Sequence, residues 1–109
     1  MLERDIEQYL VRRVAILGGI AYKFSSPSNR AVPDRLCCMP YGRIKFVECK
    51  APDKKPTPLQ AKVIEKLRAL GNEVFVVDSK EKVDILINNW REELKWENKR
   101  ISQMKMWKN

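Results

Sequence analysis

The segment VPDRLCCMPYGRIKFVECK, residues 32–50, contains two mainly apolar runs that flank a proline-tyrosine-glycine turn. Short runs of apolar residues that alternate with polar ones and are bounded by turn residues are typical of strands. We therefore expect strands over residues 34–39 and 43–51, joined as a hairpin. If residues 40–42 form the loop, the numbers of two paired residues sum to 82.

Two carboxylates interrupt this apolar pattern. In the 82 register Asp34 faces Glu48 across the hairpin, and Lys50 lies two residues along on the same face. Opposed like charges destabilise a sheet by about 0.2–1 kcal/mol unless a cation lies between them. Magnesium is commonly held by one or two carboxylates, so the cluster predicts a divalent metal site. The alternatives are a two-residue loop, which would pair Asp34 with Cys49, and an ordinary surface ion pair between Glu48 and Lys50.

The flanking segments predict three helices and two further strands. Apolar residues at helical spacing predict a helix over residues 2–17, followed by a strand over 20–24. Thr57 is the expected N-cap of a second helix, with Gln60 as its capping-box partner. A strand over 73–77 and a third helix follow. The expected buried positions of the three helices are Ile6, Leu10, Val14 and Leu17; Leu59, Val63, Leu67 and Leu70; and Val83, Leu86, Ile87, Trp90 and Leu94.

This order of elements predicts an α/β fold with a mixed sheet flanked by helices. The strand-helix-strand unit over residues 47–77 should place its two strands parallel with a right-handed crossover. A chain of 109 residues suits one domain. We place that domain at residues 1–94 and a basic extension at 95–109.

The extension holds five Lys or Arg and one Glu, which accounts for +4 of the net charge of +8. It is either a flexible basic arm whose Trp96 and Trp107 stack on bases, or a helix that packs these residues with Ile101 and Met104 on the domain or on a partner subunit. The overall charge favours a polyanionic partner, either nucleic acid or an anionic membrane surface.

Composition also excludes several classes of protein. No segment approaches the roughly 20 apolar residues of a membrane span, and the first residues lack a secretion signal. An odd number of cysteines predicts reduced thiols, so we expect a cytoplasmic protein. The absence of histidine excludes Ser-His and Cys-His catalysis and disfavours a zinc site.

The motif Pro33-Asp34, followed by Glu48-Cys49-Lys50, resembles the PD-(D/E)xK nuclease signature. The longer run GGIAYKFSSPSNRAVPDRLCCMPYGRIKFVECKAPDKKPTPLQ, followed by LRALGNEVFVVDS, resembles the VRR-NUC domain, the virus-type replication-repair nuclease, in its small stand-alone phage or bacterial form. The resemblance thus implies a protein of the cytoplasm, either bacterial or encoded by a phage in its host cell. The resemblance covers about residues 3–88. It implies a restriction-endonuclease-like αβββαβ core, to which the third helix is added.

The resemblance also implies roles for individual residues. Asp34, Glu48 and the backbone oxygen of Cys49 would bind Mg²⁺ or Mn²⁺, and Lys50 would orient or activate the attacking water. A glutamate on the first helix completes the family's site. Glu3 and Glu7 are both candidates, and we favour Glu7 because its position next to the core residue Leu10 leaves it at the edge of the apolar stripe.

Gln60 matches a glutamine that lies near the site in related nucleases, beside its expected capping role. Expected DNA contacts, each of which is also a plausible solvated surface residue, are Lys23, Ser26, Arg30, Lys54 and Lys55. The implied function is a metal-dependent, structure-selective DNA endonuclease, similar to a Holliday-junction resolvase and acting as a homodimer without a membrane partner. The alternative is a non-catalytic DNA-binding module with a vestigial nuclease site.

Overall fold

The computed structural model describes the backbone of residues 1–108 and the side chains of residues 1–105. Four strands form one mixed sheet in the order β1-β2-β3-β4, in which only the β3-β4 pair is parallel. This arrangement confirms the predicted α/β class. The elements are α1 (Glu3–Ile16), β1 (Ile20–Lys23), β2 (Arg35–Met39), the 3-10 turn η1 (Pro40–Gly42), β3 (Arg43–Cys49), α2 (Pro58–Ala69), β4 (Val74–Val77) and α3 (Lys80–Lys108).

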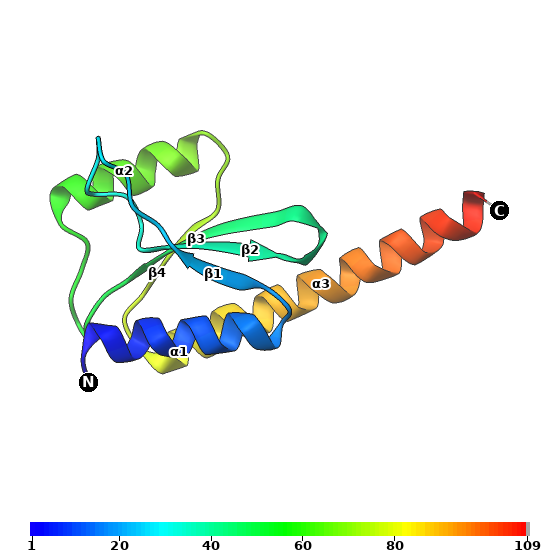
Figure 1. Ribbon diagram of the computed structural model, residues 1–109, viewed down its shortest axis with the longest axis horizontal. Helices are drawn as coiled ribbons and strands as arrows, with labels where there is room; N and C mark the ends of the chain where they lie inside the picture. Colours follow the sequence, from blue (N-terminus) through cyan, green and yellow to red (C-terminus); the bar gives the residue numbers. More distant parts are fainter. Residues whose placement is uncertain (109) are drawn as a thin grey trace.

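The helices cover the sheet unequally. Helices α1 and α3 lie side by side against one face, whereas α2 lies on the other side of the sheet (Figure 1). The main core forms between α1, α3 and the sheet face that they cover, so the face away from α1 and α3 is only partly covered, by α2. This core contains Ile6, Leu10, Val14, Ala21, Cys37, Met39, Val47, Cys49, Val77, Val83, Leu86, Ile87 and Trp90.

The β2-β3 hairpin has the predicted register. Met39 pairs with Arg43 and Leu36 with Phe46, so the numbers of paired residues sum to 82. The turn has left-handed backbone angles at Tyr41 (φ 65°) and Gly42 (φ 73°), a conformation that glycine adopts without strain. The two-residue loop is therefore wrong, and Asp34, directly before β2, comes opposite Glu48.

The N-terminus of α2 is also as predicted, but its buried face is not. Thr57 Oγ1 accepts a hydrogen bond from the Gln60 amide at 3.2 Å, and Gln60 Oε1 accepts one from the Thr57 amide at 2.9 Å. The predicted stripe is wrong at its two ends, because Leu59 is 62% exposed and Leu70 is 81% exposed. Only the middle of α2 contributes fully buried side chains to the sheet, those of Val63 and Ile64.

Helix α3 crosses the expected boundary at residue 94 without a break. A continuous helix thus replaces the flexible arm. Packing of Trp96 on the domain is also wrong, because this side chain is 60% exposed. The side chain of Trp107 lies outside the described residues. Within residues 1–108, no helix has both the length and the apolar character that a membrane span requires.

Candidate active site

The two predicted carboxylates come together at the open end of the β2-β3 hairpin, away from the η1 turn. The amide of Asp34 donates a hydrogen bond to Glu48 Oε1 at 3.2 Å, and the amide of Cys49 donates one to Asp34 Oδ2 at 2.8 Å. Each carboxylate is therefore oriented by the main chain of the opposite segment. Glu48 is 2% exposed and Asp34 is half-buried. Because Val47 and Cys49 belong to the core under α1 and α3, Glu48 projects from the opposite face of the sheet.

Lys50 is positioned next to this pair from three sides. Its amide donates to the carbonyl of Val77, which ties it to β4 at 2.9 Å. Its Nζ lies 3.3 Å from Glu48 Oε2 and donates to Gln60 Oε1 at 2.7 Å. Since Gln60 Oε1 also accepts the amide of Thr57, Gln60 is in contact with the lysine and caps α2 at the same time.

Burial and the neighbouring Asp34 charge raise the pKa of Glu48 to about 7, and the ammonium of Lys50 offsets only part of this rise. Two ionised carboxylates beside one lysine thus lack full charge compensation. In the described part of the chain, no three side chains of His, Cys, Asp or Glu gather into a metal-binding group. The donor set that fits Mg²⁺ is therefore two carboxylates, the Cys49 carbonyl and water, all of which are hard oxygen ligands.

Glu7 lies on α1 and connects that helix to β1 and β2. Its Oε1 accepts hydrogen bonds from Lys23 Nζ and from Arg35 Nε, both at 2.8 Å. Burial raises the pKa of Glu7, but the two ion pairs outweigh burial and leave this pKa below its usual value. Glu3, the other candidate, is exposed in the first turn of α1.

Arg35 is a site-positioning residue that the sequence analysis did not identify. Its Nη1 donates to the carbonyl of Ala21 at 3.0 Å while its Nε holds Glu7. Strand alternation could have identified Arg35. Successive side chains of a strand point to opposite faces of the sheet, so the residue after Asp34 points toward α1.

Known proteins with similar sequence or structure were compared with the chain. No family model matches it. A protein named "Putative nuclease p44", from Acyrthosiphon pisum secondary endosymbiont phage 1, is 55% identical over 84 residues, which cover 77% of this chain and 90% of that protein. A solved structure described as "VRR_NUC domain" matches with a TM-score of 0.75 and 39% identity, over 79% of this chain and 94% of that one. The chain belongs to the VRR-NUC family. The resemblance and the fold class predicted from the sequence are thereby confirmed.

The predicted DNA contacts of this VRR-NUC protein are mostly solvent-exposed. The side chain of Lys23 is 62% exposed although it pairs with Glu7. Arg30, Lys54 and Lys55 are exposed in loops, whereas Ser26 is half-buried, with its hydroxyl 3.3 Å from that of Ser28. Their contact with DNA stays a prediction.

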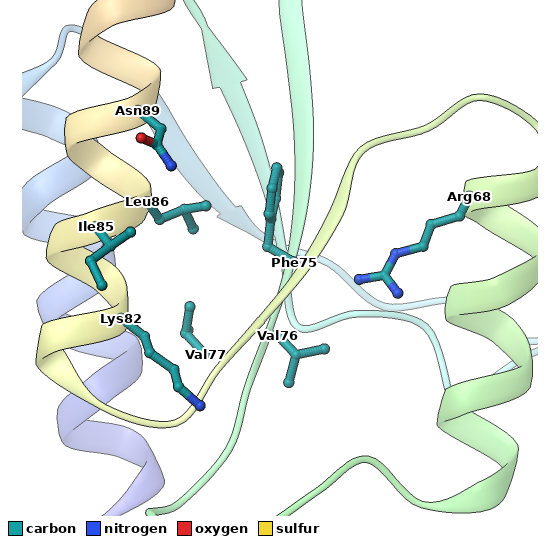
Figure 2. Close-up of a pocket in the computed structure, with 8 residues that line it drawn as sticks. All are labelled: Arg68, Phe75, Val76, Val77, Lys82, Ile85, Leu86 and Asn89. Atoms are coloured by element: carbon teal, nitrogen blue, oxygen red, sulfur yellow. The ribbon is translucent and has the colours of Figure 1, made fainter.

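A cavity of about 410 Å³ lies elsewhere in the VRR-NUC fold, between α2 and α3 over β4 (Figure 2). Its lining is mainly apolar and contains none of the predicted site residues. The carboxylates instead lie at the open end of the β2-β3 hairpin, away from this cavity. The cavity is lined by Arg68, Phe75, Val76, Val77, Lys82, Ile85, Leu86 and Asn89.

The buried thiols of Cys37 and Cys49 in this VRR-NUC protein are poor nucleophiles. Burial raises the pKa of Cys37 to about 12, and burial and the neighbouring carboxylates, Asp34 foremost, raise that of Cys49 even more. All three cysteines are free. A protonated, buried Cys49 is consistent with the expectation that only its backbone oxygen takes part in the site.

Proposed function

We propose that this VRR-NUC protein is a metal-dependent endonuclease that hydrolyses phosphodiester bonds of DNA. The observation that carries the proposal is the cluster at the hairpin end, where the main chain orients Asp34 and Glu48 and where Lys50 Nζ lies 3.3 Å from Glu48. Membership of the VRR-NUC family supports the general part of this proposal, that the protein is a nuclease.

In this mechanism Asp34, Glu48 and the Cys49 carbonyl would hold Mg²⁺ or Mn²⁺. When bound, such a metal would lower the pKa of a water molecule and stabilise the negative charge that develops on the phosphate. Lys50 orients the attacking water and places a positive charge where negative charge develops on the phosphate. Gln60 limits the freedom of the Lys50 side chain through its 2.7 Å hydrogen bond.

Glu7 lies on α1, against the sheet face opposite the one from which Glu48 projects, and reaches the hairpin through Arg35. Its carboxylate is fixed by Lys23 and Arg35, so it cannot swing freely toward a substrate. We propose that it completes the acidic side of the site and orients water from a fixed position. The Lys23 side chain remains partly exposed beside Glu7, and we propose that its ammonium contacts a phosphate of the bound DNA.

The alternative is a DNA-binding module with a vestigial site. It has the support of the positive charge alone, which also suits a nuclease. Against it, the main chain orients both carboxylates, and Gln60 Oε1 accepts a hydrogen bond from Lys50 Nζ and so holds it beside Glu48. A site without selection for chemistry has no need for a buried carboxylate in this strand.

We further propose that the protein is a homodimer that prefers branched DNA such as four-way junctions, because a two-fold dimer suits a substrate with two-fold symmetry. The support for a dimer is the uncovered face of the sheet. It carries Ile20 and Tyr22, each 53% exposed, and Ile44, 45% exposed. A cluster of exposed apolar side chains on one face is typical of protein contacts.

The experiment compares end-labelled four-way junction, flap, nicked and plain duplex substrates in Mg²⁺, Mn²⁺ or EDTA. We expect metal-dependent cutting, fastest on the junction, and a dimeric mass by light scattering. Equal rates on all four substrates would contradict structure selectivity, and cutting in EDTA would contradict metal dependence. Binding of DNA without any cutting in either metal would favour the vestigial module.

A further inference from the structure

The last two turns and more of α3 extend beyond the sheet. Figure 1 shows the helix continuing past the β2-β3 hairpin, with the C-terminus at the far end of the molecule from α2. At 1.5 Å per residue, the 29 residues of α3 span about 43 Å, close to the longest dimension of the chain, 52 Å.

This extension is fixed to the hairpin rather than free to bend at its base. Glu97, which is 5% exposed, accepts hydrogen bonds from Arg43 Nη2 on β3 and, at 2.8 Å, from Arg100 Nη2. The hydroxyl of Tyr41 in the hairpin turn donates to Asn98 Oδ1 at 3.1 Å. Two contacts on successive residues of the helix therefore set its direction.

One face of the extension is aromatic and basic. Trp96 is 60% exposed, and the guanidinium of Arg100 lies 5.8 Å from its ring centre. Together with Lys99 and Gln103 these side chains line a shallow hollow of about 280 Å³. Glu97, the single acid of residues 95–109, faces the hairpin. Arg100 pairs with Glu97, and Glu92, one turn before Trp96, pairs with Lys95, so the face keeps an excess of positive charge through Lys99 and the residues that follow it.

Charge and side-chain type distinguish the occupants of such a face. A second copy of the chain would bring its own net charge of +8 and the +4 of its extension against this surface, which is unfavourable. A protein partner generally needs a larger apolar contact than one tryptophan offers. Lysine, arginine and glutamine are the residues that contact phosphate and sugar in protein–DNA complexes.

We propose that the arm face, defined by Trp96, Lys99, Arg100 and Gln103, binds the sugar–phosphate backbone of duplex DNA on one side of the cleavage site. The inference rests on the proposed function insofar as DNA is the substrate. It adds a contact that lies outside the catalytic cluster and that acts without base recognition.

The distance between the arm face and the carboxylates sets the length of DNA required. From Arg43, where the arm is anchored, to Glu48 is five residues of β3, or about 17 Å. From Glu97 to Gln103, the last residue of the arm face, the helix adds about 9 Å. The arm face therefore contacts DNA at about 17–26 Å from the cut, which corresponds to about 5–8 base pairs at 3.4 Å each.

The test is DNA binding by the full chain in EDTA, where no cutting occurs. Fluorescence anisotropy with a labelled 30-base-pair duplex is measured over a series of KCl concentrations for wild type, Lys99→Ala and Arg12→Ala. Arg12 is an exposed residue of α1 outside both the site and the arm, and its removal changes the charge equally. The slope of log K against log salt is negative, and each lost phosphate contact lowers its magnitude by about 0.9. We expect that decrease for Lys99→Ala alone.

Equal slopes in the three proteins would overturn the proposal. A Trp96→Ala or Lys99→Ala variant that loses dimer mass at an unchanged slope would overturn it as well, because the face would then contact a second copy. Cleavage assays separate this outcome from the proposed function. If no protein cuts DNA but the slope decreases in Lys99→Ala, the arm is confirmed and the nuclease proposal fails; if cutting is normal and the slopes are equal, the reverse holds.

Discussion

Replacing Glu48 with glutamine should stabilise the metal-free protein at neutral and alkaline pH. Glu48 is 2% exposed, next to Asp34, and its pKa is raised from 4.5 to about 7. Glutamine keeps an oxygen that can accept the Asp34 amide and adds an NH₂ group that can donate to the Asp34 carboxylate. The substitution therefore removes the buried charge and keeps the hydrogen bond from the Asp34 amide, but it gives up the 3.3 Å contact of Glu48 Oε2 with Lys50 Nζ.

The size of the expected stabilisation follows from the difference between the pKa of Glu48 in the folded state and its pKa in the unfolded state. A raised pKa in the folded state means that stability from this group is complete below pH 4.5 and is lost as pH rises to about 7. At 1.36 kcal/mol per pH unit, the loss is about 3 kcal/mol. For a domain of this size that corresponds to about 13 °C in melting temperature.

The assay is thermal unfolding of wild type and Glu48→Gln in EDTA between pH 4 and 8. The melting temperature of wild type should fall relative to that of the variant as pH rises above 4.5, and the difference should become constant above about pH 7.5. Added Mg²⁺ at pH 8 should raise the melting temperature of wild type much more than that of the variant. Parallel curves at every pH would refute the reasoning about Glu48, and an equal response to Mg²⁺ would refute its role as a ligand.

Substitutions at three further residues test the positioning of Lys50 by Gln60, the role of Glu7 in cleavage and the contribution of Lys45 to stability. Gln60→Ala should slow cleavage by about 10-fold, because it frees the Lys50 side chain, whereas Gln60→Glu should retain helix capping and most stability; equal melting temperatures of the two would contradict this. Glu7→Ala should lower cleavage rates in a plasmid-nicking assay while Glu3→Ala leaves them unchanged. Lys45→Ala should destabilise the fold by about 1–3 kcal/mol in urea unfolding, since it removes a buried side chain together with its ion pairs to the partly exposed Glu73 and Glu93; a change below about 0.5 kcal/mol would count against that role.

The hairpin and its carboxylates could be predicted because local rules determine them. Alternation marks the two strands, and a three-residue turn with Gly42 permits one register, which the structure has. The capping box of α2 is equally local, since Thr57 and Gln60 are three residues apart. The contact of Gln60 with Lys50 was expected only from the family, because no short-range rule brings the start of α2 to the end of β3.

Features that depend on long-range packing could not be predicted in this way. Leu59 and Leu70 have the spacing of a buried stripe, yet α2 packs on the sheet only through its middle. Lys45, in an alternating strand, has the pattern of a surface residue but is 1% exposed. Its partners Glu73 and Glu93, at 2.6 and 2.8 Å, lie 28 and 48 residues away in sequence.

The most direct test of the proposed chemistry is the single-turnover cleavage rate of a supercoiled plasmid by wild type and by Asp34→Asn, in Mg²⁺ and in EDTA. Asparagine has nearly the same shape and can still accept the Cys49 amide, so folding should be retained and can be verified by circular dichroism. We predict Mg²⁺-dependent cutting by wild type and a rate at least about 100-fold lower in the variant. Equal rates of the two proteins, or cutting by wild type in EDTA, would contradict a metal site built on Asp34.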